Sequence, residues 1–112
     1  MREALYDGYL WTQEAKAAYL TDLKAEGNKF PPEQAALLIQ HHCYTDWRDV
    51  IPTITIPTLV IGSTKLDMVK AESNRWNHEH IVGSKLVFVQ GAHGSFLEYP
   101  EEFNQIIIDF IG

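Results

Sequence analysis

The feature that most restricts the fold of this chain is a pair of short, nearly continuous apolar runs in its second half. Residues 56–62 read Ile-Pro-Thr-Leu-Val-Ile-Gly, and residues 85–89 read Lys-Leu-Val-Phe-Val, with a glycine at position 91. Runs of this length, bounded by proline or glycine, are typical of strands buried on both faces of a parallel sheet. We therefore expect two strands, residues 58–61 and residues 85–89, to lie side by side and parallel.

Helical patterns separate and follow these two runs. Residues 70–81 carry Ala71, Trp76 and Ile81 as inward positions, and a second helix begins at Pro100 with acidic residues in its first turn. The apolar stripe of that second helix has the i, i+3, i+4, i+7, i+8 spacing of one helix face and consists of Phe103, Ile106, Ile107, Phe110 and Ile111. The order strand, helix, strand, helix predicts an α/β fold with a parallel crossover.

Two parallel strands are too little sheet to form a stable domain. The first half of the chain adds only helices to them. Residues 5–10 predict a short amphipathic turn, Thr12 is the expected N-cap of a helix that ends at Gly27, and Pro31 with Pro32 opens another helix that continues past residue 39. The pattern therefore predicts a piece of a larger fold.

Composition excludes several classes of function. The 112 residues are 46% hydrophobic and 21% charged, as in ordinary globular proteins. The formal charge of −6 argues against a nucleic-acid partner and against binding to an anionic membrane surface. We see no signal peptide pattern and no apolar run of the roughly 20 residues that a membrane span needs. Cys43 is the single cysteine, so the default expectation is a reducing, cytoplasmic location.

Two chemically useful side chains follow the predicted strands. Asp67 lies in the loop after the first strand, and His93 lies between Gly91 and Gly94 in the loop after the second. Ligands of open parallel sheets bind outside the carboxyl ends of the strands. An aspartate that accepts a hydrogen bond from Nδ1–H of a histidine fixes its tautomer and stabilises the imidazolium, as the acid–base pair of a nucleophilic enzyme does. The plainer alternatives are a turn residue for Asp67 and a surface histidine for His93.

Other histidines do not form a metal-binding pattern. The sequence contains His41-His42-Cys43 and, further on, His78-x-His80. Adjacent or i, i+2 residues on a helix point in different directions, whereas zinc sites use spacings such as i, i+4. We predict that the chain binds no metal and no cofactor.

Several spaced motifs in the second half of the chain occur in a recognisable order. Residues 46–52 read Asp-Trp-Arg-Asp-Val-Ile-Pro and are followed by the apolar run 56–62. Residues 91–94 read Gly-Ala-His-Gly, and residues 97–104 read Leu-Glu-Tyr-Pro-Glu-Glu-Phe-Asn. In this order the motifs resemble the C-terminal part of the α/β-hydrolases, in particular small esterases and cofactor-free haloperoxidases. The first two resemble the entry to the seventh strand of that family, and the last two resemble its histidine loop and last helix. The resemblance implies an α/β-hydrolase fragment. In it, residues 1–43 form a helical cap-like segment, and residues 44–112 form the core segment with the last two parallel strands and their helices.

The same resemblance implies roles for particular residues. His93 would be the general base of the catalytic triad, and the triad acid would lie in the loop after Gly62. Asp67 is the favoured acid, although it stands one position later than the family's usual acid, and Asp46 is the alternative.

The nucleophile is missing from the pattern. The family carries it on a Gly-x-Ser-x-Gly elbow upstream of the acid and the histidine. The four serines of this chain are Ser63, Ser73, Ser84 and Ser95, and none has those flanking glycines. We therefore predict that the chain contains no nucleophile and is inactive by itself.

Two interpretations remain open. In the first, a complementing N-terminal hydrolase chain completes the enzyme, which then acts on a small ester-type substrate. In the second, the chain is a non-catalytic remnant or binding module that forms a homo-oligomer. The sequence does not name the substrate, since the pocket walls would come from both the cap and the missing half.

Overall fold

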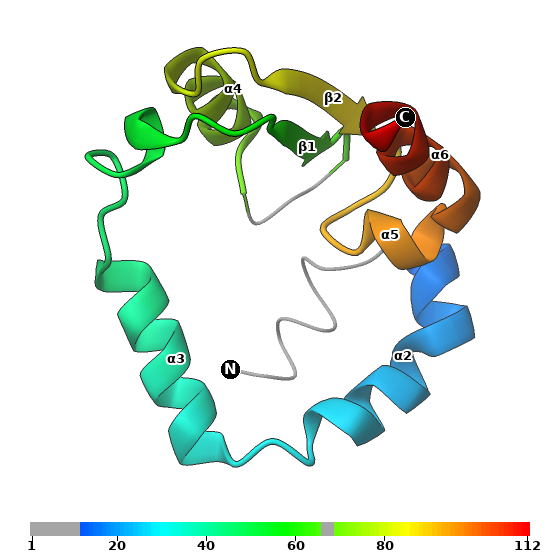
Figure 1. Ribbon diagram of the computed structural model, residues 1–112. Coiled ribbons are helices and arrows are strands. Elements are labelled where there is room, and N and C mark those ends of the chain that lie inside the picture. The colour runs from blue at the N-terminus through cyan, green and yellow to red at the C-terminus, as the bar shows by residue number, and fades with distance from the viewer. Residues whose placement is uncertain (1–11, 66–68) are drawn as a thin grey trace.

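The computed structural model describes residues 12–65 and 69–112. Within these ranges the chain forms a two-stranded parallel sheet and several helices, some of which lie away from the sheet, as Figure 1 shows. Strand β1 (Leu59–Ser63) pairs with strand β2 (Lys85–Val89), with Leu59 opposite Lys85 and Ser63 opposite Val89. The predicted adjacent, parallel strands are therefore confirmed. The turn expected at residues 5–10 lies outside the described residues.

The exact position of β1 differs from the expectation. Gly62 was predicted to end the strand, but it lies inside β1 and is buried. A Cβ at this position would come within 2.6 Å of Cε1 of Phe88 and within 2.8 Å of Nδ2 of Asn74. Glycine is used here because the Phe88 ring and the Asn74 amide pack directly on the strand backbone. Pro57, which has no N–H to donate, lies ahead of the strand.

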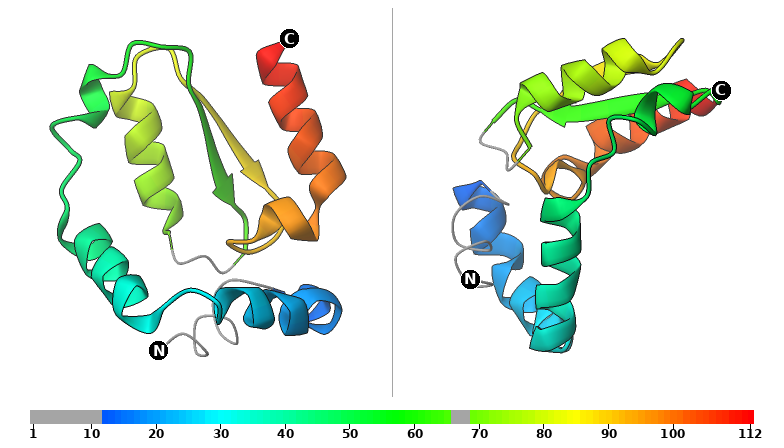
Figure 2. Two further views of the ribbon diagram at one scale, coloured as in Figure 1. Left: turned by 60° about the horizontal axis from the view of Figure 1, so that its bottom comes forward. Right: turned by 90° about the vertical axis from the view of Figure 1, so that its left-hand side faces the viewer.

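Helix α4 (Ala71–His80) connects the two strands, and helix α6 (Pro100–Ile111) follows the short helix α5 (Ser95–Glu98). Helices α4 and α6 lie on opposite faces of the sheet (Figure 2). The helices predicted at 70–81 and from Pro100 onward are confirmed, whereas the single turn of α5 was not predicted. Ile81, at the end of α4, and Val89, in β2, are buried.

Helix α2 (Gln13–Gly27), which begins beside α5, and helix α3 (Pro32–Tyr44) lie away from the sheet and diverge from each other (Figures 1 and 2). Thr12 is the N-cap of α2, as predicted, and its Oγ1 accepts a hydrogen bond from the backbone N–H of Ala15. No residue of α3 is buried, and a short 3₁₀ helix, η1 (Ile51–Thr53), leads from α3 toward β1.

The core is small for a chain of this composition. Among the described residues, Val89 is the one large side chain that is almost completely buried, and no residue of α6 is buried. Leu37, Leu38 and Ile111 remain 61–76% exposed. The radius of gyration of 15.6 Å exceeds the roughly 13 Å expected of a compact chain of this length. The fold therefore has the open, partly covered form that the sequence predicted for a fragment.

Candidate functional site

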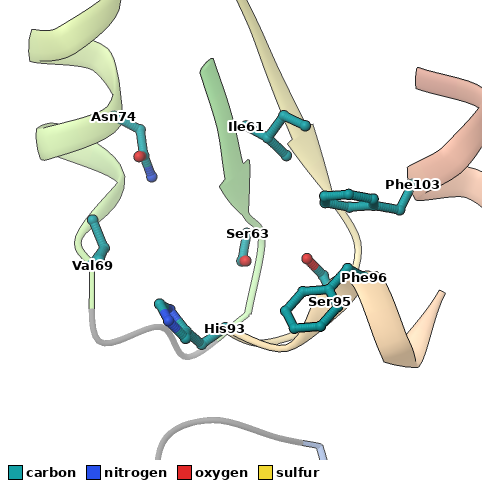
Figure 3. A pocket seen from close by; sticks show the side chains of 8 residues that line it. All are labelled: Ile61, Ser63, Val69, Asn74, His93, Ser95, Phe96 and Phe103. Atoms are coloured by element: carbon teal, nitrogen blue, oxygen red, sulfur yellow. The ribbon is translucent and has the colours of Figure 1, made fainter. Parts of the chain in front are cut away.

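A pocket of about 240 Å³ lies at the carboxyl ends of the two strands. Its lining comes from β1, from α4 and the segment just before it, and from the loop and helices after β2, as Figure 3 shows. The lining residues are Ile61, Ser63, Val69, Asn74, His93, Ser95, Phe96 and Phe103. The site lies where ligands bind in parallel α/β sheets.

His93 is the titratable side chain of this lining. It lies in the loop between β2 and α5, is exposed, and projects toward the space between β1 and α4 (Figure 3). An exposed imidazole at this edge can receive a proton from a group that approaches from solvent or from another polypeptide. The sequence-based placement of His93 at the carboxyl edge of the strands is confirmed.

The two residues before His93 are held by several hydrogen bonds. The Ser63 hydroxyl donates to the carbonyl oxygen of Ala92 over 2.8 Å, and the backbone N–H of Lys65 donates to the carbonyl oxygen of Gly91 over 3.0 Å. Glu98 Oε2 accepts from the Ala92 backbone N–H over 2.8 Å. These bonds come from the end of β1 and from α5, so both neighbouring elements set the position of the histidine loop.

Comparison with known proteins supports what this geometry indicates. No family model matches the chain. A stretch of 65 residues is 29% identical to serine hydrolase BPHL from Homo sapiens and from Mus musculus. The structure resembles the crystal structure of the enol-lactonase from Burkholderia xenovorans LB400 with a TM-score of 0.81 and 24% identity over 97% of this chain. The chain has part of an α/β-hydrolase fold.

This segment of an α/β-hydrolase fold is much shorter than the proteins that it resembles. The matched stretch covers 57% of the segment and 22% of each serine hydrolase BPHL, and the structural match covers 44% of the enol-lactonase. More than half of the enol-lactonase chain therefore has no counterpart in this segment.

The structure describes only one of the two candidate triad acids. Asp67 lies outside the described residues, so its pairing with His93 stays a prediction. Asp46 lies between α3 and η1, ahead of the amino end of β1, and both of its carboxylate oxygens accept hydrogen bonds from Arg48. The backbone N–H of Arg48 adds a third bond, to Asp46 Oδ1. The described contacts of Asp46 therefore stabilise a turn.

The Asp46–Arg48 pair gives a testable pH dependence. Hydrogen bonds from the Arg48 side chain, followed by that from its backbone N–H, lower the pKa of Asp46 to about 2. Because this folded-state pKa is below the ordinary value of about 3.9, the pair stabilises the fold above pH 4, and that contribution is lost as the pH falls toward 2. We expect Arg48→Gln to return the pKa of Asp46 toward 3.9, measured by carbon-detected NMR titration. A wild-type Asp46 that already titrates near 3.9 would contradict this.

None of the four serines has the setting of a nucleophile. Ser63 donates its hydroxyl proton to the Ala92 carbonyl, and Ser95 is buried at the start of α5. Ser73 is exposed in the first turn of α4. Ser84 does contact a histidine, with 2.8 Å between its Oγ and Nδ1 of His78, but its hydroxyl donates to the carbonyl oxygen of His78. That pair lies just before the amino end of β2, away from the pocket.

Two residues that matter to the site were not singled out from the sequence. Glu98 holds the histidine loop through the N–H of Ala92, and Asn74 is a buried polar residue of the pocket wall. The signal for Glu98 was its place directly before the Tyr-Pro start of α6, six residues after Ala92.

Within the described ranges, no group of three potential metal ligands comes together, and no helix is long and apolar enough to cross a membrane.

Proposed function

We propose that this chain is the C-terminal portion of a serine-type α/β-hydrolase and that it supplies the general base, His93, to a nucleophile on another polypeptide segment. The observation that carries the proposal is the position of His93: it lies in a loop held from two sides, at the edge of a pocket where a hydrolase fold places its chemistry. The order of the elements, with the last strand followed by the histidine loop and the final helix, supports the C-terminal assignment.

The proposed reaction divides the triad between two segments. A serine Oγ of the completing segment attacks the ester carbonyl, and His93 takes its proton and later gives that proton to the leaving alcohol oxygen. A carboxylate, for which Asp67 is the candidate because Asp46 lies ahead of the amino end of β1, accepts a hydrogen bond from Nδ1–H of His93 and stabilises the imidazolium. The oxyanion donors also belong to the completing segment, because one of them is the backbone N–H after the nucleophile. The substrate class is a small ester.

We propose that an N-terminal hydrolase segment is the partner. Among the described residues, strand β1 has a neighbouring strand on one side only, so the N–H and C=O groups along its outer edge can pair with another strand. Large apolar side chains that such a body would cover are exposed, namely Leu37, Leu38, Ile39, Trp47, Ile56, Phe96 and Ile108. Helices α2 and α3 would form the cap, residues 1–43, over the completed pocket. The exposed thiol of Cys43 suits a reducing cytoplasm.

The same exposed surfaces favour one alternative. A homo-oligomer would cover the edge of β1 and the apolar faces without creating an active site, since both copies lack the elbow. Light scattering separates the two assemblies. A particle of twice the mass of the chain that does not change when an N-terminal hydrolase segment is added favours the homo-oligomeric remnant.

A fluorophosphonate probe tests the proposed function. The chain would be mixed with the part of the Burkholderia enol-lactonase that lies outside the structural match, and with any neighbouring hydrolase segment that carries a Gly-x-Ser-x-Gly elbow. We expect the probe to label the added segment, and to do so faster when the chain is present. The positive control is the part of the enol-lactonase that the structural match covers, which should accelerate labelling of the added segment. If this control accelerates labelling and the chain does not, the result contradicts the proposal.

A further inference from the structure

We propose that Glu98 is a positioning residue for His93 and that it also ties the start of helix α2 to the histidine loop. The role in positioning a catalytic base rests on the proposed function, whereas the contacts of Glu98 do not. The side chain lies at the last residue of α5, five positions after His93, and is partly buried.

Both carboxylate oxygens of Glu98 accept hydrogen bonds from backbone N–H groups. Oε2 accepts from Ala92, the residue directly before His93, and Oε1 accepts from Thr12, which is 86 positions away in the sequence. Hydrogen bonds to an ionised carboxylate are about twice as strong as neutral ones. A single side chain therefore joins the histidine loop to the start of α2.

The histidine loop is shaped to bring its backbone onto this carboxylate. Gly91 has a φ of +108°, and a Cβ at this position would lie 2.4 Å from Glu98 Oε2. Glycine thus allows the loop to approach closely enough for the N–H of Ala92 to reach the oxygen. Since the Ala92 carbonyl is held by Ser63 and by the Ser95 backbone N–H, both the N–H and the carbonyl of the residue before His93 are fixed.

The second bond of Glu98 extends this control to the cap. Thr12 is the N-cap of α2, so its backbone N–H lies at the point where the described cap helices begin. Movement of α2 would move an acceptor that also holds Ala92. The geometry therefore couples the orientation of the α2 helix to the position of the His93 imidazole.

Glu98→Gln tests this in the isolated chain by NMR. The variant keeps the size of the side chain, but its amide replaces one acceptor oxygen with an N–H₂ donor that faces a backbone N–H. We expect the amide protons of Ala92 and Thr12 to shift upfield, at least one of them to exchange about ten-fold faster, and the ring signals of His93 to shift. Glu101→Gln, in the exposed first turn of α6, is the matched control and should leave all three unchanged.

A second variant keeps the proposal falsifiable if Glu98→Gln does not fold. The φ of Thr12 is −68°, which proline can adopt, so Thr12→Pro removes the N–H donor, and Thr12→Ala controls for loss of the capping hydroxyl. We expect Thr12→Pro, but not Thr12→Ala, to shift the His93 ring signals. Unchanged His93 and Ala92 signals in the folded Glu98→Gln variant, or in Thr12→Pro, would overturn the proposal. These NMR readouts need no catalysis. If the chain fails to activate an N-terminal hydrolase segment while the NMR results bear out the contacts of Glu98, the proposed function is contradicted and the role of Glu98 in holding the loop is not.

Discussion

Replacing Gly91 with alanine is expected to destabilise the chain by about 2–4 kcal/mol. Two causes add. A φ of +108° is strained for any residue with a Cβ, and the new methyl group would lie 2.4 Å from Glu98 Oε2 and 3.1 Å from the Tyr99 ring. The carboxylate must then withdraw, which weakens its hydrogen bonds to Ala92 and Thr12. Urea unfolding followed by circular dichroism, at one fixed protein concentration, measures the loss.

Gly83→Ala is the matched control for this prediction. Gly83 also has a positive φ, +75°, but a Cβ there would have no heavy atom within 4 Å. This variant keeps the backbone strain and lacks the clash, so we expect it to cost only about 1 kcal/mol. Equal losses of unfolding free energy in the two variants would show that the hydrogen bonds of Glu98 do not depend on the close approach of Gly91.

The parts of the fold that the sequence predicted are those with strong local patterns. The continuous apolar runs identified β1 and β2, and the stripe that begins at Phe103 identified α6, because hydrophobic periodicity reports directly on which face is covered. Thr12 was recognisable as an N-cap since a hydroxyl before a helical pattern has one common use. These signals depend on residues close together in the sequence.

Features that depend on distant neighbours were less predictable. Gly62 looked like the end of a strand, and only the position of the Phe88 ring explains why glycine lies within it. The single turn of α5 has too few residues for a periodic signal. In the stripe of α6, Ile111 is 76% exposed, although its spacing predicted an inward position.

The candidate site was predictable to the extent that it follows the order of strands and loops. His93 comes directly after β2, so the carboxyl-end rule placed it at the pocket. The role of Glu98 was not visible, because its bond to Thr12 joins the two ends of the chain and no local pattern encodes it. The pairing of His93 with Asp67 stays a prediction.

The second large effect is expected from His93→Ala in the completed enzyme. With the chain joined to a hydrolase segment that carries the serine elbow, removal of the base should lower the rate of ester hydrolysis by about 10³-fold or more. The reason is that the serine hydroxyl is a weak nucleophile without a base that takes its proton. His42→Ala, on the exposed face of α3, is the matched control and should leave the rate unchanged.

A loss of less than about ten-fold in His93→Ala, with the assembly intact by light scattering, would contradict the role of His93 as general base. Assembly must be checked in the same samples, since a variant that fails to associate would also lose activity.

We propose that this chain carries the base of a hydrolase but not its nucleophile. The most direct test is the hydrolysis rate of a short p-nitrophenyl ester by the chain alone, compared with the chain plus an N-terminal hydrolase segment. We expect the chain alone to give no more than the buffer rate, and the mixture to hydrolyse the ester faster than the sum of the separate rates. Turnover by the chain alone at a rate comparable to that of the mixture would contradict the proposal.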